Sequence, residues 1–333
     1  MKILQLSGGK SAEREISLVS AAFVRNVLEE SGHEVIPVEI SIDGRWSLEG
    51  AFLEIKTGHS VWKLLRNGSE ITFDAIFPVL HGPFGEDGTV QGLCGMAGWP
   101  CAGADVMTSA LAMNKITTKE LVSSRDIPVL PWKSYTIQSP PSPESLPPLL
   151  YPVFVKPARM GSSVGISRVD SPETLQDAAD LAFRFDNLIL IENGLENARE
   201  IEVALLSESG TISSSVAGEI LPGHEWYDFS AKYNCEGSEL LIPAPIPDTL
   251  SNKIRSCAEN CFALLQGSGF ARADFLLDED GKFYFNEINT IPGFTEISMF
   301  PKLWNASGVS PSEVINRILD EAVRYHRRSA EPE

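Results

Sequence analysis

The sequence predicts an α/β protein with a Rossmann-like N-terminal domain and a C-terminal part of α+β character. Strand and helix patterns alternate over roughly the first hundred residues, which implies a parallel sheet. A Gly8-Gly9 turn joins the first strand to the first helix, without the full G-x-G-x-x-G fingerprint of dinucleotide-binding proteins. Farther along, two aromatic-rich runs joined by an Asp-Gly step predict a β-hairpin.

The composition is typical of a globular protein with a large core. Of the 333 residues, 43% are hydrophobic and 22% charged, and no apolar run approaches the roughly 20 residues that span a bilayer. A net charge of −18 disfavours nucleic acid and anionic membranes as partners. The apolar start, Met1 to Leu6, is too brief for a signal-peptide core, so we expect a cytoplasmic protein. The five cysteines form no Cys-x-x-Cys pair and are expected to be reduced packing residues.

The first strand and helix bring an acidic residue close to the glycine turn. Lys2 to Ser7 is a predicted buried strand, and Ala12 to Glu30 has helical spacing with Ser11 as the expected cap. Glu13 would fall in the first turn of this helix. Because the helix dipole favours acids there for structural reasons, both a structural and a catalytic role stay open.

Two more strands are predicted in the N-terminal domain, His33 to Ile40 and Ala75 to Leu80. The second one ends at His81, which is followed by a glycine-rich acidic loop. Open α/β sheets place ligand-contacting groups at such strand ends. A capping histidine is the structural alternative.

A second lobe is expected to begin near Asp105. Ser109 to Ser123 has good helix propensity and carries Lys115. The proline-rich segment 139 to 148 is predicted to be a surface connection. A strand then ends at Lys156 and leads into a loop with the sequence Gly161-Ser162-Ser163. Small residues let backbone amides approach phosphate oxygens, although the spacing is not that of a P-loop and a flexible hairpin tip has similar composition.

Acidic residues gather on the next two predicted strands, Leu188 to Glu192 and Glu200 to Leu206. Acids at strand ends can bind a ribose or an adenine amine. The segment Leu221 to Leu241 has neither strand nor helix period and many aromatic residues, so it is predicted to be an ordered, functional loop. Helices are expected at Asp248 to Gln266 and Ser312 to Arg324.

The predicted hairpin carries ionisable side chains where a core strand pair should be apolar. If the central Glu-Asp step forms the turn, Arg272 lies opposite Glu287 and Asp274 opposite Phe285. Period-two alternation then puts Arg272, Asp274, Glu287 and Asn289 on one face. Two carboxylates and an amide form an all-oxygen ligand set suited to magnesium. A solvated face with one Arg-Glu pair is the structural alternative.

Taken together, these blocks resemble the D-alanine-D-alanine ligases of the ATP-grasp superfamily over nearly the full length. The blocks occur in family order: GGKSAEREISLVSA, LHGPFGEDGTVQG, MNK, VFVKPARMGSSVGISRV, YDFSAKY, and GFARADFLL followed by FNEINTIPGFTEISMFPKL. The resemblance implies a two-lobed ATP-grasp domain after the Rossmann-like one. The expected divisions are a substrate domain at 1–104, a central lobe at 105–208 and a C-terminal lobe at 209–333.

The resemblance further implies ligation of two D-alanine molecules for peptidoglycan precursor synthesis. ATP would phosphorylate one carboxylate to D-alanyl phosphate, which the amine of the second D-alanine attacks, releasing ADP and phosphate. The implied ligands of two Mg²⁺ or Mn²⁺ ions are Asp274, Glu287 and Asn289. The implied ATP contacts are Lys115, Lys156, Ser162, Ser163, Glu192, Leu195, Glu200 and Lys232.

Matching family positions also imply catalytic and substrate-binding residues. Arg272 and the backbone N–H of Gly293 would stabilise charge on the tetrahedral intermediate. Glu13, Ser162 and Tyr233 would link two loops into a lid that excludes water. The implied D-alanine contacts are Glu13, His81, Ser298 and Met299. Family resemblance also implies a homodimer.

The sequence departs from the family pattern at three points, and three alternative functions stay open. The segment from Glu192 to Glu200 is one residue longer than in the family pattern, Asn114 replaces a common Asp, and Met160 replaces a frequent polar residue. A ligase that uses D-lactate or another amino acid as second substrate is one alternative. A nucleotide-binding ATP-grasp protein without catalysis is another, and a periplasmic-type amino-acid binding protein is the third.

Overall fold

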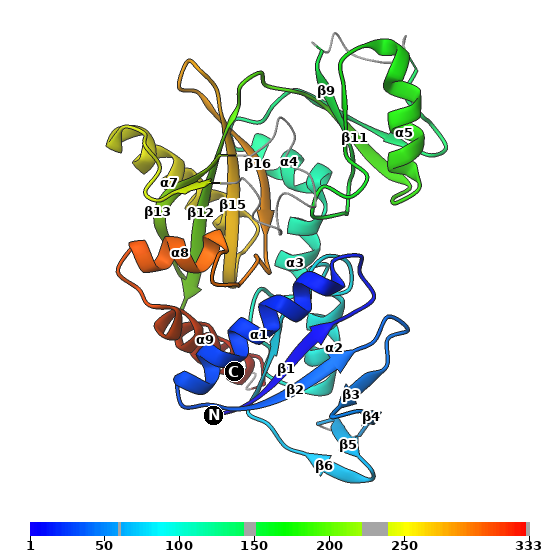
Figure 1. Ribbon diagram of the computed structural model, residues 1–333, viewed down its shortest axis with the longest axis vertical. Coiled ribbons are helices and arrows are strands. Elements are labelled where there is room, and N and C mark those ends of the chain that lie inside the picture. Colours follow the sequence, from blue (N-terminus) through cyan, green and yellow to red (C-terminus); the bar gives the residue numbers. More distant parts are fainter. Residues whose placement is uncertain (59–60, 143–150, 222–238, 331–333) are drawn as a thin grey trace.

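The computed structural model describes residues 1–58, 61–142, 151–221 and 239–330, and its three β-sheets are arranged along the long axis of an elongated molecule (Figure 1). The N-terminal sheet lies at one end, and the sheet that contains β9 and β11 lies at the other. Its helices are α1 (Arg14–Glu30), α2 (Thr89–Ala97), α3 (Val106–Met113), α4 (Lys115–Ser123), α5 (Leu175–Phe183), α7 (Asp248–Leu264), α8 (Met299–Ala306) and α9 (Pro311–Ala330), with a short 3₁₀ helix at Pro172–Thr174.

The first sheet is mixed rather than parallel throughout. Its order is β6-β5-β4-β3-β2-β1-β7, and β1 pairs in parallel with β2 and β7 as the Rossmann-like prediction requires. The prediction is wrong for β3 to β6, which pair antiparallel. At most six residues connect each of these strands to the next, which is too few for the crossover helix that a parallel pair needs. The strands are β1 (Lys2–Gly8), β2 (Glu34–Ile40), β3 (Trp46–Leu48), β4 (Ala51–Lys56), β5 (Lys63–Arg66), β6 (Ser69–Ile71) and β7 (Ala75–Pro78).

Two predicted helix boundaries are wrong, and each changes the position of a candidate site residue. Glu13 is the N-cap residue of α1 rather than part of its first turn, and the Ser11 hydroxyl accepts a 3.1 Å hydrogen bond from the Glu13 backbone N–H. The single helix expected at Ser109 to Ser123 is two helices, α3 and α4, because Asn114 is extended and its side chain caps α4. Lys115 is therefore the first residue of α4.

The other two sheets form the walls around the site. The second has the order β10-β9-β11-β8, and the third has the order β14-β13-β12-β15-β16. β12 belongs to the third sheet, although it precedes the expected division at residue 208, and that division remains a prediction. The strands are β8 (Trp132–Thr136), β9 (Val153–Pro157), β10 (Ser167–Val169), β11 (Leu188–Asn193), β12 (Arg199–Glu208), β13 (Thr211–Leu221), β14 (Glu239–Leu241), β15 (Gly269–Leu277) and β16 (Phe283–Asn289).

The predicted hairpin is present as β15 and β16, but its register differs from the prediction. Arg272 lies opposite Asn289 and Asp274 opposite Glu287, with a β-bulge before Phe275. The prediction assumed a two-residue turn, whereas the connection is longer and is closed by the hydrogen bond from the backbone N–H of Asp278 to the carbonyl of Lys282. Because opposite residues in an antiparallel pair share a face, the four polar side chains still lie together.

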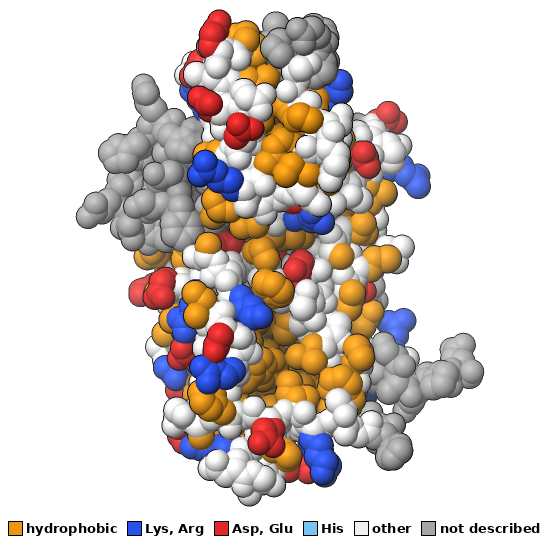
Figure 2. Space-filling model, turned by 90° about the vertical axis from the view of Figure 1, so that its right-hand side faces the viewer, with side chains coloured by type: hydrophobic (Ala, Val, Ile, Leu, Met, Phe, Trp, Pro, Cys, Tyr) orange, Lys and Arg blue, Asp and Glu red, His pale blue; other side chains and the backbone are white. Residues whose placement is uncertain are grey.

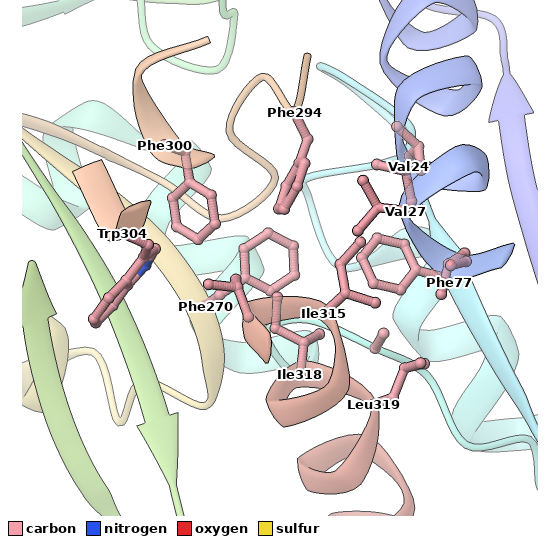
Figure 3. Packing of buried hydrophobic residues seen from close by; sticks show 14 of the residues in the cluster. Val24, Val27, Phe77, Phe270, Phe294, Phe300, Trp304, Ile315, Ile318 and Leu319 are labelled. Carbon is pink, nitrogen blue, oxygen red and sulfur yellow. The ribbon is translucent and has the colours of Figure 1, made fainter. Parts of the chain in front are cut away.

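One hydrophobic cluster joins the N-terminal sheet to the C-terminal part of the chain (Figure 3). Helix α9 contributes Ile315, Ile318 and Leu319, which lie between side chains of α1 and β7 on one side and the Phe270 and Phe294 rings on the other. The Phe270 ring lies 6.3 Å from that of Phe77. This packing holds the segment after β16 against the N-terminal domain.

Figure 2 shows one face of the molecule, on which acidic and basic side chains are interspersed and hydrophobic side chains gather in the lower half, over the N-terminal part. Among the described residues, no helix is long and apolar enough to cross a membrane. The described cysteines, Cys94, Cys101, Cys257 and Cys261, form no disulfide with one another, as expected.

Candidate active site

A cavity of about 990 Å³ lies between the second and third sheets. It is lined by many of the residues that the sequence singled out: Lys115, Lys156, Ser162, Ser163, Glu192, Leu195, Glu200, Asp274 and Glu287. Other candidates are not among the residues that line it, namely Glu13, His81, Arg272, Asn289, Gly293, Ser298 and Met299. Lys232 and Tyr233 lie outside the described residues.

The wall formed by β9 and β11 holds a buried carboxylate between two lysines. Glu192 on β11 accepts a hydrogen bond from Lys156 on β9, and its other oxygen lies 2.9 Å from Nζ of Lys119 on α4. Burial raises the pKa of Glu192, but the two ammonium groups outweigh burial and lower this pKa to about 2. Burial also lowers the pKa of Lys119 against the opposing effect of Glu192. The cluster carries one negative and two positive charges, so its net charge is positive.

Lys115 links the central lobe to the hairpin. Its Nζ donates a 2.8 Å hydrogen bond to the carbonyl of Met160 and lies 2.9 Å from Oε2 of Glu287. Burial lowers the pKa of Lys115, but Glu287, Glu86 and Glu13 outweigh that effect and the net shift is upward. The ammonium is therefore held charged at the junction between α4, the Gly-Ser-Ser loop and β16.

On the hairpin, Arg272 is fixed by carboxylates on its own strand and on β12. Its Nε and Nη2 each donate a 2.7 Å hydrogen bond to Asp274, and Nε lies 3.1 Å from Oε2 of Glu202. A planar guanidinium held in this two-pronged way has a defined orientation. Asp274 lines the cavity, so Arg272 is placed directly behind its wall.

The donor set on the hairpin fits a hard divalent cation. Asp274 and Glu287 are cross-strand neighbours, and Asn289 lies on the same face two residues from Glu287. All three offer oxygen atoms, which magnesium and manganese prefer. In this structure the two carboxylates lie against Arg272 and Lys115, so the same oxygens already attract positive charge.

Glu13 lies between two glycine-containing loops. It is 3% exposed and accepts a hydrogen bond from the Ser162 hydroxyl. Burial raises its pKa, and the nearby Glu86 carboxylate adds to this, while Ser162, His81 and Lys115 oppose it. A Cβ atom at Gly82 would lie 2.1 Å from Oε2 of Glu13, and Gly82 has a φ of +74°, so a larger residue there would displace the Glu13 carboxylate and strain the loop. The structure thus links Glu13 to Ser162 as the sequence resemblance implied.

His81 connects the N-terminal domain to the loop after β16. Its Nδ1 lies 2.9 Å from the Ile291 carbonyl, and its Nε2 lies 3.1 Å from the Ser20 hydroxyl. Oε1 of Glu86 lies 3.8 Å from Nδ1. The ring is 3% exposed, so these neighbours enclose it almost completely in the described arrangement.

The loop after β16 ends at the start of helix α8. Ser298 is the N-cap residue of α8, and its hydroxyl accepts a 3.0 Å hydrogen bond from the Thr295 backbone N–H. Gly293 lies close to Ser298, since a Cβ there would be 3.2 Å from the hydroxyl oxygen. The Met299 side chain is buried in the core cluster, which leaves its backbone N–H at the helix N-terminus as the group suited to a carboxylate.

Sequence reasoning missed two charged residues that the structure brings to the site, Lys119 and Glu86, and noted Glu202 only as one of the acids on the predicted Glu200 to Leu206 strand. Each has the appearance of an ordinary surface charge in its local segment, but each is less than 10% exposed. Lys119 lies four residues after Lys115 on α4, and that helical spacing is the signal that could have identified it.

Comparison with known proteins decides the family. A family model described as "D-ala D-ala ligase N-terminus" matches residues 2–104, and one described as "D-ala D-ala ligase C-terminus" matches residues 121–320. The chain belongs to the D-alanine-D-alanine ligase family. D-alanine-D-alanine ligase B of Clostridium tetani is 41% identical over 339 residues, covering 97% of this chain and 94% of the relative. D-alanine-D-alanine ligase A of Bradyrhizobium diazoefficiens is 42% identical, covering 98% and 96%.

Solved structures of ligases share the fold over nearly the whole chain. The D-alanine-D-alanine ligase from Coxiella burnetii matches with a TM-score of 0.88 and 30% identity, covering 99% of this chain and 96% of that one. The VanG D-Ala:D-Ser ligase from Enterococcus faecalis matches with a TM-score of 0.84 and 31% identity, covering 98% and 99%. D-alanine-D-alanine ligases and a D-Ala:D-Ser ligase therefore share this architecture, and the fold alone does not select the second substrate.

Proposed function

We propose that this chain joins two D-alanine molecules into D-alanyl-D-alanine, using ATP, as a step in peptidoglycan precursor synthesis. The observation that carries this proposal is the position of the Asp274–Glu287 cross-strand pair. It lies on the cavity wall beside Lys115, while Lys156 and Glu192 line the same cavity. Cations and oxygen ligands thus converge where a triphosphate and a carboxylate would meet. Such convergence suits transfer of a phosphoryl group to a carboxylate.

Lys115 and Lys156 are proposed to bind ATP phosphates, with Ser162 and Ser163 supplying hydroxyl or backbone donors. Ser162 and Ser163 have left-handed φ values of 49° and 60°, which bends the loop sharply at the cavity. Glu192, Leu195 and Glu200 are proposed to contact the adenosine. Asp274, Glu287 and Asn289 would hold two magnesium or manganese ions, which neutralise phosphate charge when bound. Lys232 is proposed for a phosphate from family resemblance alone.

The amino-acid substrates are proposed to lie between this cavity and the N-terminal domain. Glu13 would hold the ammonium of the first D-alanine, near His81, and Ser298 with the Met299 backbone N–H would hold the carboxylate of the second. Arg272 and the Gly293 N–H would receive the oxyanion formed when the amine attacks the acyl phosphate. Tyr233, with Ser162 and Glu13, is proposed to complete the lid.

The second substrate is the open choice, because a D-Ala:D-Ser ligase shares the fold. We propose D-alanine, because the chain carries the Ala-Lys-Tyr segment typical of dipeptide-forming members. The test supplies ATP with equal D-alanine, D-serine and D-lactate at pH 7.5 and identifies the products by mass spectrometry. D-alanyl-D-alanine should predominate, and a predominance of D-alanyl-D-serine or D-alanyl-D-lactate would contradict the proposal.

We further propose a cytoplasmic homodimer, which family resemblance supports. Met96 of the N-terminal domain and Val106 and Met107 at the start of α3 are exposed, and hydrophobic side chains gather in the lower half of the face in Figure 2. Light scattering after size exclusion should report twice the chain mass of 36.3 kDa. A species of single chain mass at micromolar concentration would contradict the dimer.

A further inference from the structure

Helix α4 directs two lysines, four residues apart, to different walls of the cavity. Lys115 reaches Glu287 on β16, and Lys119 reaches Glu192 on β11. Lys115 lines the cavity and Lys119 does not. The side chain of Lys119 is 2% exposed and that of Glu192 is 1% exposed, so neither group of this pair is solvated. Lysine side chains are almost never buried to this extent unless they are paired, so the Lys119–Glu192 pair calls for a specific role.

The Glu192 carboxylate is shared, and the two lysines that share it differ in their access to the cavity. Lys156 lines the cavity and contacts one oxygen, whereas Lys119 contacts the other oxygen from the protein interior. If Glu192 had only Lys156 as partner, the two charges would cancel. The second lysine leaves a net positive charge, and Lys156 is the member of the cluster that can present it to a ligand.

We propose that Lys119 is a positioning residue of the nucleotide site: it holds the Glu192 carboxylate ionised and in place, so that Lys156 keeps a positive charge available for a phosphate oxygen. This inference rests on the proposed function, in which the cavity binds ATP. Lys119 itself does not touch the nucleotide. It acts on binding through Glu192, and therefore on the affinity for nucleotide more than on turnover.

The test is a double-mutant cycle on nucleotide affinity, with ADP as the calorimetric probe so that no turnover occurs. Lys119→Met should raise the Kd for ADP by about tenfold or more. Without Lys119, the Glu192 carboxylate cancels the positive charge of Lys156, and the charge-assisted contact between Lys156 and a phosphate oxygen is lost. In the Glu192→Gln background the same change should have no further effect. The KM for ATP should rise in Lys119→Met, while kcat and the KM for D-alanine change by less than about threefold. Lys133→Met, an exposed lysine on β8, is the matched control and should match wild type.

Two results would overturn the proposal: an unchanged Kd in Lys119→Met, or an equal loss in both backgrounds. Removing one partner of a buried pair can prevent folding, whereas removing both charges is better tolerated. If Lys119→Met does not fold, the double variant decides, and a Kd weaker than that of Glu192→Gln alone contradicts the role. A wild-type protein that binds no ADP would instead contradict the proposed function.

Discussion

At the scale of single residues, the carboxylates of the hairpin lie against cations of the same chain. Asp274 is held by Arg272, and Glu287 lies against Lys115. A group that already attracts an ammonium or a guanidinium at this position is suited to a magnesium ion in the presence of ATP. The proposed metal role therefore makes these side chains important for turnover and much less so for folding.

Glu287→Gln should lower kcat by about 10- to 100-fold at saturating magnesium, because one charged metal ligand is lost while the shape is kept. The melting temperature should change little. The measurement is a magnesium titration of the ligase rate, with Asp280→Asn in the exposed hairpin connection as control. Near-normal turnover of Glu287→Gln would remove Glu287 from the proposed ligand set.

Glu192 should make the free energy of unfolding fall when the pH is lowered below about 4.5. Its pKa is lowered from 4.5 to about 2, so the folded state binds fewer protons than the unfolded state between these values. Its stabilisation is complete above pH 4.5 and is lost as pH falls towards 2, a change on the order of 3 kcal/mol. Urea unfolding between pH 6 and 2.5 should show this loss. The loss should be smaller in the Lys119→Met/Glu192→Gln double variant, and an identical slope in both proteins would contradict it.

Sequence patterns identify charged side chains that stand where apolar ones are expected. They do not identify charged side chains whose partners lie far along the chain. Asp274 and Glu287 are conspicuous because they interrupt apolar strands. Lys119 and Glu86 are not conspicuous, since a charge that is buried by residues far along the chain cannot be distinguished from a solvated one by its local sequence. Burial of this kind is a tertiary property, which local pattern does not contain.

At the scale of elements, Asn114 ends one helix and begins the next. Its side-chain oxygen accepts hydrogen bonds from the backbone N–H groups of Ile116 and Thr117, at 3.2 and 3.3 Å. The chain therefore changes direction before Lys115, and the ammonium is directed towards β16. The helix propensity of this segment predicts helix correctly but gives no reason for the break, which depends on the cap.

Asn114→Ala should lower the free energy of unfolding by about 1 kcal/mol, the usual cost of a lost N-cap. Asn114→Asp keeps a capping oxygen and should stay within about 0.5 kcal/mol of wild type. Urea denaturation of the three proteins gives the comparison. Equal destabilisation by both substitutions would show that the side-chain cap does not stabilise α4.

Strands whose turns carry a clear signal could have been predicted more completely. Asn67-Gly68 has positive φ at both residues and joins β5 to β6, as an Asn-Gly step does in tight hairpins. The bulge before Phe275 could not have been predicted from such a signal, because the alternation along β16 does not reveal an extra residue. The face of the four polar side chains was predicted correctly, and their pairing was not.

At the scale of the whole molecule, α9 ties the C-terminal part of the chain to the N-terminal sheet. Its residues pack with α1 and β7 as well as with Phe270 on β15. The parts of the site are then held together by long-range contacts such as His81 with Ile291 and Glu13 with Ser162. The sequence predicts the helix but not this packing, which depends on the fold.

Ile318→Ala should destabilise the protein by about 2 to 5 kcal/mol, because this buried side chain fills the cluster between the two parts. Ile137→Ala, at a position 52% exposed, is the matched control and should cost much less. Chemical denaturation with fluorescence and circular dichroism reports both. A small effect of Ile318→Ala would mean that α9 contributes little to joining the two parts.

In the proposed reaction, the protein transfers the terminal phosphoryl group of ATP to a D-alanine carboxylate before the peptide bond forms. The most direct test uses D-alanine labelled with ¹⁸O in its carboxylate and follows the label into inorganic phosphate by mass spectrometry. For each D-alanyl-D-alanine formed, one phosphate that carries one ¹⁸O atom should be released. The amine breaks the bond between the carbonyl carbon and the bridging oxygen, so this labelled oxygen leaves with phosphorus. Formation of dipeptide with unlabelled phosphate would exclude the acyl phosphate intermediate.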